Sequence, residues 1–159
     1  MRLSRGARAP AATVVAGALL VALVATSSAA APQRIVLNRS MAGVEIGDGI
    51  GRLHQALGEP RAVDYVDNEI TGSLRLDIYG RLSFSSYGGS ILSMKTTRRA
   101  IRTRSGIGVG TTKRRLEREF PGMDCYWHVC TIVAGGGLAT IGKRVTSFRI
   151  RQGKVRLVV

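Results

Sequence analysis

Residues 43–60 read GVEIGDGIGRLHQALGEP, and residues 106–123 read GIGVGTTKRRLEREFPGM. The two stretches align at an offset of 63 residues, with glycine over glycine and apolar residue over apolar residue. The matched pairs are Gly43 with Gly106, Val44 with Ile107, Ile46 with Val109, Gly47 with Gly110, Arg52 with Arg115, Leu53 with Leu116 and Leu57 with Phe120. Self-similarity at a fixed offset is the mark of a repeated structural unit.

The similarity continues beyond these stretches, at an offset of 64 after one inserted residue. The later pairs are Ser83-Phe84 with Ser147-Phe148, Gly89 with Gly153, and Ile91 with Val155. Their shared order and spacing predict two tandem units, residues 42–95 and 106–159, joined by a basic connector over residues 96–105.

Each unit is predicted to begin with a short helix. An apolar-alternating stretch ends at a glycine, and the helix then starts at a capping residue, Asp48 or Thr111. In the first unit, apolar residues at i, i+3 and i+7 from Ile50 form one helix face. Gly58 and Pro60 end that helix, since glycine takes the left-handed position and proline prevents continuation.

The sequence after each helix alternates between apolar and polar residues, which is typical of strands with one buried face. Expected strands cover residues 74–78, 82–86, 91–95, 145–150 and 155–159. Gly88-Gly89 and Gln152-Gly153 supply the hairpin turns. The predicted fold class is α+β: two tandem units, each a short helix followed by antiparallel strands, with the helices packed on one sheet face.

The run Gly47-x5-Leu53-x3-Leu57-Gly58-x-Pro60, followed by a hairpin with a glycine turn, resembles the repeat of the SmpA/OmlA outer-membrane assembly lipoproteins. A tandem pair of such units resembles the beta-lactamase inhibitory protein family, whose two halves form a saddle that grips a protein. The resemblance covers most of both units and implies a non-enzymatic, protein-binding surface on the open sheet face. This chain lacks the first family's lipidated cysteine and is poorer in aromatic residues than the second family's gripping face.

The N-terminus has the features of an export signal. Three arginines precede an Ala/Val/Leu run over residues 11–25, and small residues follow. We expect a signal peptide over residues 1–30 and a short linker over residues 31–41. An uncleaved membrane anchor is the alternative. Either way, the sequence predicts a bacterial protein that is secreted or held in the cell envelope.

The chain has two cysteines, Cys125 and Cys130. In an exported chain the pair predicts a disulfide. The bridged loop would display Tyr126, Trp127 and His128 as candidate binding residues. A metal site is the alternative, because thiolates and imidazole are zinc ligands. The spacing does not favour it, and we expect no metal and no cofactor.

Net charge is +14, and basic residues concentrate between Lys95 and Arg118, where nine stand against one acid. Such a stripe fits an anionic partner, whether a wall polymer, an acidic lipid surface or an acidic protein face, although a solvated face is the alternative. Export and the lack of interleaved aromatic residues argue against nucleic acid. The candidate binding residues here are Arg98, Arg99, Arg102, Arg104, Lys113 and Arg114.

Candidate catalytic groups are few. His54 is expected to be a surface residue of the first helix, and His128 has no Gly-x-Ser-x-Gly or other nucleophile motif beside it. Asp64, Asp67 and Glu69 form an acidic cluster, which we interpret as a solvated loop, with a carboxylate pair or calcium ligands as the alternative.

We therefore expect an exported, monomeric, non-enzymatic binding module that contacts a protein or an anionic envelope component. One alternative is a small envelope hydrolase that uses His128 or the acidic cluster. Another is a structural stabiliser of an envelope complex.

Overall fold

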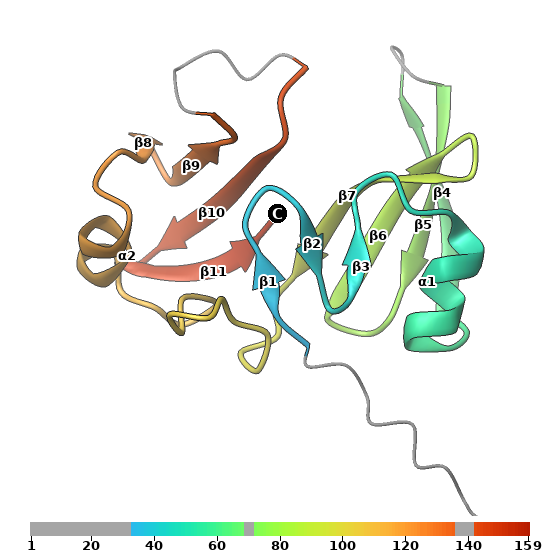
Figure 1. Ribbon diagram of the computed structural model, residues 1–159, viewed down its shortest axis with the longest axis horizontal. Helices are drawn as coiled ribbons and strands as arrows, with labels where there is room; N and C mark the ends of the chain where they lie inside the picture. The colour runs from blue at the N-terminus through green and yellow to red at the C-terminus, as the bar shows by residue number, and fades with distance from the viewer. Residues whose placement is uncertain (1–32, 69–71, 136–141) are drawn as a thin grey trace, which may run out of the picture.

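The computed structural model describes residues 33–68, 72–135 and 142–159 (Figure 1). Within these ranges the chain forms two short helices and mostly antiparallel strands. In chain order the elements are β1 (Ile35–Val36), β2 (Ser40–Met41), β3 (Val44–Glu45), α1 (Ile50–Leu57), β4 (Ala62–Asn68), β5 (Gly72–Ile78), β6 (Leu82–Tyr87), β7 (Ser90–Thr96), α2 (Lys113–Glu119), β8 (Asp124–Tyr126), β9 (Val129–Val133), β10 (Val145–Arg151) and β11 (Lys154–Val158). The five strands expected from alternation correspond to β5, β6, β7, β10 and β11.

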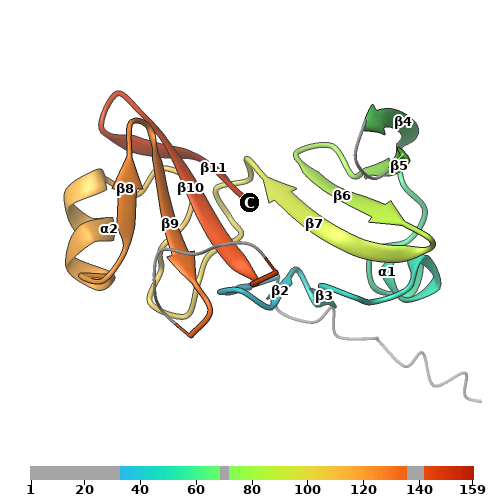
Figure 2. The same ribbon diagram turned by 90° about the horizontal axis from the view of Figure 1, so that it is seen from above.

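Eight of the strands form one sheet in the order β4-β5-β6-β7-β11-β10-β9-β8. The four strands that follow α1 make one half, and the four that follow α2 make the other. The halves meet between β7 and β11, where the register contains one pair, Thr96 with Val158. Figure 2 shows the two halves diverging from this point, with α1 and α2 at opposite ends of the molecule.

Backbone hydrogen bonds that link each helix start to its second hairpin recur in the two halves. In the first half, Gly47 N–H donates to Ile91 O over 2.8 Å, Ile91 N–H donates to Asp48 O over 2.8 Å, and Ile50 N–H donates to Gly89 O over 3.1 Å. In the second half, Gly110 N–H donates to Val155 O over 2.8 Å, Val155 N–H donates to Thr111 O over 2.9 Å, and Lys113 N–H donates to Gly153 O over 2.8 Å. The partners in each pair of bonds are related by the offsets of 63 and 64 seen in the sequence.

One hydrophobic cluster forms the core. Each helix buries one leucine in it, Leu53 from α1 and Leu116 from α2. The sheet contributes Phe84 and Phe148, both fully buried and aligned with each other in the sequence comparison. Burial of a leucine or phenylalanine side chain contributes roughly 1.5 to 3 kcal/mol. These four aligned apolar residues therefore supply much of the core.

The segment expected to be an N-terminal linker instead forms β1 and β2, which pair with β3 in a small second sheet. Ile35 is buried, and its N–H donates to the carbonyl of Arg102 over 3.0 Å. The N–H of Asn38 donates to Thr146 Oγ1 on β10 over 2.7 Å. This small sheet is therefore bonded both to the connector and to the second half.

The predicted helix caps are each wrong by one position, because the N-cap residues are Gly49 and Thr112. Asp48 Oδ2 accepts from the N–H of Glu45 over 2.8 Å, and Thr111 Oγ1 accepts from the N–H of Gly108 over 3.0 Å. Both side chains thus close the turn before the helix. Helix α1 has no side-chain cap, and Thr112 caps α2.

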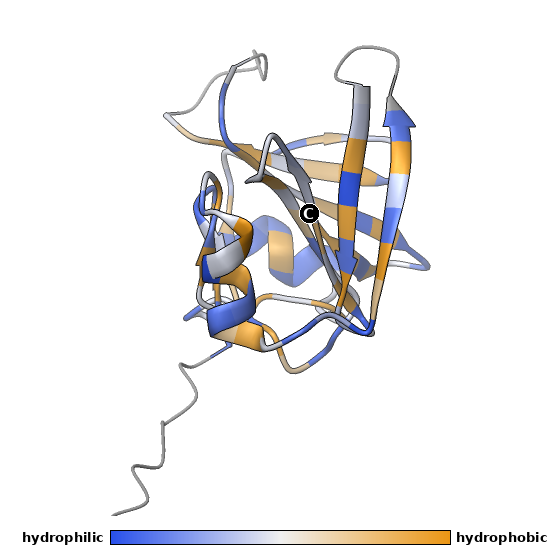
Figure 3. Cartoon of the chain, turned by 90° about the vertical axis from the view of Figure 1, so that its right-hand side faces the viewer, coloured by the Kyte–Doolittle hydropathy of each residue, from blue (hydrophilic) through white to orange (hydrophobic). Residues whose placement is uncertain are grey.

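The acidic cluster belongs to a strand and not to a loop. Asp64 and Asp67 lie on β4, an edge strand paired along its length with β5, and both are exposed. Glu69 lies outside the described residues. Figure 3 shows polar and apolar residues alternating along these two strands. The predicted signal peptide also lies outside the described residues, and within them no helix is long and apolar enough to cross a membrane.

Candidate binding surfaces

Strands β8 and β9 form a hairpin closed by the predicted disulfide. Cys125 and Cys130 are register partners on the two strands, and their sulfur atoms are bonded. Cys130 also pairs with Phe148 of β10, so the bridge joins the sheet edge to the core. The disulfide therefore clamps a short turn onto a buried framework.

This turn displays two large aromatic side chains. Tyr126 is 74% exposed and Trp127 is 81% exposed, with ring centroids 6.1 Å apart. Trp127 has a φ of +54°, a left-handed conformation that is uncommon for a residue with a bulky side chain. The carbonyl of His128 accepts from the N–H of Ile150 over 2.6 Å, which ties the turn to β10. The three predicted loop residues thus share one braced, exposed tip.

The predicted basic residues are divided by their contacts. Arg102 donates to the carbonyls of Gly106 and Val109 over 2.9 and 3.3 Å, so it ties the connector to the residues that follow it. Lys113 Nζ lies 3.5 Å from Glu117 Oε1, one turn further along α2. Arg98 donates to Gln33 Oε1 over 3.3 Å, and Arg99, Arg104 and Arg114 are exposed. The predicted basic residues therefore differ in how far their charges are engaged by contacts within the molecule.

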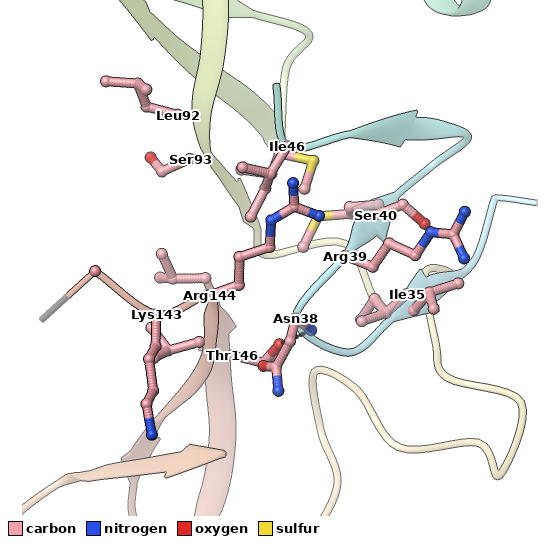
Figure 4. Close-up of a pocket in the computed structure, with 16 residues that line it drawn as sticks. Ile35, Asn38, Arg39, Ser40, Ile46, Leu92, Ser93, Lys143, Arg144 and Thr146 are labelled. Carbon is pink, nitrogen blue, oxygen red and sulfur yellow. Dashed lines mark hydrogen bonds between the residues drawn. The ribbon is translucent and has the colours of Figure 1, made fainter. Parts of the chain in front are cut away.

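An apolar groove of about 260 Å³ lies between the small sheet, β7 and β10. Its apolar lining includes Ile46, Leu92 and Met94. Figure 4 shows the Arg144 side chain, from the residue before β10, extending toward Ile46, with Thr146 beside Asn38 at the other end. Each wall comes from a different part of the chain, and the sequence analysis did not identify this groove.

A buried charged network lies between α1 and β5. Asp77 is fully buried, and Arg75 donates to both of its oxygens, over 2.8 and 3.0 Å at the shortest. These hydrogen bonds raise the pKa of Arg75 above its usual value. His54 Nε2 lies 3.7 Å from Asp77 Oδ1, and Nδ1 lies 3.5 Å from Glu59 Oε2. The expectation that His54 is a surface residue is therefore wrong: it is three-quarters buried against this network.

Tyr79 borders the same network. Its hydroxyl donates to the carbonyl of Gly58, at the end of α1, over 3.0 Å. Burial raises the pKa of Tyr79 to about 12, and the nearby charges of Asp77 and Glu59 add to the effect. The protonated phenol thus connects the end of the first helix to the sheet.

The candidate catalytic residues are not brought together. His128 is exposed at the tip, far along the sheet from β4, which carries Asp64 and Asp67 at the opposite edge. Since adjacent residues of a strand alternate in direction, Asp64 and Asp67 lie on opposite faces of β4. Across the three described ranges there is no group of three or more side chains able to hold a metal ion.

The sequence contained a weak signal for the charged network of Arg75, Asp77 and His54, since Arg75 and Asp77 stand two apart in an alternating strand and so share a face. The sequence contained no signal for the apolar groove between the small sheet, β7 and β10. That groove depends on strands of two residues, which are too short to show a period.

Neither a protein-family model nor a curated protein matches this chain. Two solved structures are similar in part. An extracellular protein containing a SCP domain from Bacillus anthracis strain Ames is 10% identical with a TM-score of 0.44, and the match covers 71% of this chain and 42% of that one. A proposed beta-lactamase inhibitor protein from Streptococcus mutans is 12% identical with a TM-score of 0.30, and the match covers 71% and 82%. The chain thus spans less than half of the Bacillus protein, and at these scores neither likeness supports an argument about function.

Proposed function

We propose that this protein is an exported, non-enzymatic module that binds a partner protein through the tip of the β8–β9 hairpin. The observation that carries the proposal is the exposure of Tyr126 and Trp127 on a turn braced by a disulfide. Tyrosine and tryptophan are the residues most enriched at the energetic centres of protein interfaces. A braced turn also loses little conformational entropy on binding.

We further propose that the molecule is built from two related units. The recurring backbone bonds support this, because they join equivalent residues of the two halves at the offsets found in the sequence. The equal burial of Leu53 and Leu116, and of Phe84 and Phe148, also supports it. On this reading the tip is an elaboration of the second unit.

Export is part of the proposal. The N-terminal sequence has the composition of a signal peptide, and the Cys125–Cys130 bond is of the kind that persists in oxidising compartments. A partner would therefore be another protein of the cell envelope or the medium.

A site-specific crosslinking experiment tests the tip. A photo-crosslinking amino acid replaces Trp127 in cells, and in a matched strain it replaces Tyr87, which is 52% exposed on β6. We expect a light-dependent adduct from position 127 and none from position 87, with the partner identified by mass spectrometry. Equal adducts at both positions, or none at 127, would contradict the proposal.

The purified partner then allows a direct measurement. Trp127 is the single tryptophan of the chain, so its emission reports on the tip alone. We expect a blue shift when the partner is added, because the indole leaves water. Binding that leaves the emission unchanged would place the contact elsewhere. The Trp127→Ala variant should bind at least tenfold more weakly, since loss of an interface anchor costs roughly 2 kcal/mol or more.

A further inference from the structure

Two adjoining clefts lie where β1 runs beside the connector, at the lower edge of Figure 1. The larger is open, of about 750 Å³, and its apolar lining includes Ile35, Val36 and Phe120. The smaller, of about 310 Å³, is lined mainly by the connector. Both clefts are lined by Arg34 and Arg104. An apolar trough therefore adjoins a cationic pocket, with two arginines at their boundary.

The positive charge here has no acidic counterpart. None of the described residues lining either cleft is Asp or Glu. Arg98 is held at the same place by its hydrogen bond to Gln33, and Arg99 follows it in the exposed connector. Arg102 is different, because both of its terminal nitrogens donate to the carbonyls of Gly106 and Val109. The surface thus consists of Arg34, Arg98, Arg99 and Arg104 around an apolar trough; we call it the basic end.

The basic end lies close in sequence to the predicted export segment. Gln33 and Arg34 stand eight and nine residues after the apolar run at 11–25. Where that segment is kept as an anchor it would hold the basic end beside the bilayer, and after cleavage only the arginines and the apolar trough would bring the basic end to a lipid surface. Val36 lines the same trough as Arg34, and 49% of it is exposed. This exposed apolar side chain is therefore available to contact a lipid interface.

We propose that the basic end binds the surface of an anionic lipid bilayer. Arginines attract acidic headgroups, and an apolar trough beside them lies at the depth where headgroup and acyl chain meet. A hydrophilic anionic polymer would match the arginines but would leave the trough unused. The proposal goes beyond the protein-binding tip, which is formed by different strands, and it rests only on the export part of the proposed function.

Vesicle flotation tests the proposal. The full-length chain is expressed and the protein is purified in the form that the cell produces after any processing. Its intact mass then identifies its first residue. The probes are phosphatidylcholine vesicles with and without about one third phosphatidylglycerol. One variant replaces the arginines of the basic end: R34Q, R98Q, R99Q and R104Q. A charge-matched control replaces four exposed arginines elsewhere: R61Q, R118Q, R149Q and R151Q.

We expect binding to the anionic vesicles alone, lost at about 0.5 M salt, where charges are screened over a few ångströms. The basic-end variant should bind on the order of 100-fold more weakly, and the control should lose much less. Equal losses in the two variants would overturn the proposal, because net charge alone would then explain binding. Binding that survives high salt, or retention on isolated anionic wall polymer without vesicle binding, would overturn it as well.

Discussion

The two halves of the sheet share a backbone framework but stabilise their outer strands by different means. In the first half, β4 and β5 pair over seven register positions, and Arg75 and the buried Asp77 of β5 form an ion pair. In the second half, β8 and β9 pair over three positions, and the disulfide joins them. The two halves therefore share corresponding buried apolar positions, while the outer strands of each half are stabilised separately.

The sharpest test of the shared framework compares its two buried leucines. Leu53→Ala and Leu116→Ala should each lower the free energy of unfolding by about 3.5 kcal/mol, because each leaves a cavity in the same core. Urea denaturation gives both values, with the half-exposed Leu92→Ala as a control that should cost less than about 1 kcal/mol. A large cost at one helix and a negligible cost at the other would break the equivalence of the halves.

The first half should depend on its buried carboxylate. Asp77→Ala removes the carboxylate that accepts the hydrogen bonds of Arg75, so we expect a loss of about 2 kcal/mol in the free energy of unfolding. Asp67→Ala, on the exposed edge strand, should change that free energy by no more than about 0.5 kcal/mol. Similar costs for the two variants would show that the network does not stabilise this half.

The second half should depend on its disulfide. The double variant Cys125→Ala/Cys130→Ala should lose about 2 kcal/mol, because the unfolded chain is no longer constrained by the short loop. Urea unfolding of the oxidised protein, the reduced protein and this variant gives the comparison. If the oxidised protein unfolds at the same urea concentration as the other two, the disulfide does not stabilise the second half.

The smallest effect concerns Tyr79 and is confined to alkaline pH. Its pKa is raised from 10.0 to about 12, so the fold favours the protonated phenol. The stabilisation is fully present below pH 10, where the unfolded phenol is also protonated, and is lost as pH rises through about 12. The native protein should therefore lose more stability than Tyr79→Phe between about pH 9 and pH 11.

Ultraviolet titration of the four tyrosines provides an independent check on Tyr79. The difference between the titration curves of the native protein and of Tyr79→Phe reports Tyr79 alone, and its midpoint should lie at about pH 12. A midpoint near pH 10 would show that the burial of Tyr79 is not maintained in solution.

Sequence reasoning predicted the elements that carry a period and a punctuating residue. Both helices and five strands follow from apolar spacing and from turns such as Gly88-Gly89. The disulfide followed from the number of cysteines and the export signal. Each of these depends on local chemistry, which the order of residues expresses directly.

What sequence reasoning did not predict depends on contacts between distant residues. β1 and β2 are too short to show alternation, and they form because Ile35 and Asn38 bond to the connector and to β10. β4 was interpreted as a loop because its acids suggest solvent, yet an edge strand tolerates charged residues. The tip residues were foreseen, whereas the grouping of Arg34 with Arg104 required the fold.

The single register pair between β7 and β11 has a mechanical consequence. Two plates joined by one register pair can change their angle unless other contacts span the joint, and beside the shared core the small N-terminal sheet does so through its bonds to Arg102 and Thr146. It acts as a brace. A cut after residue 30 would leave the brace whole, while trimming a few residues further would remove β1 and free the angle between the plates.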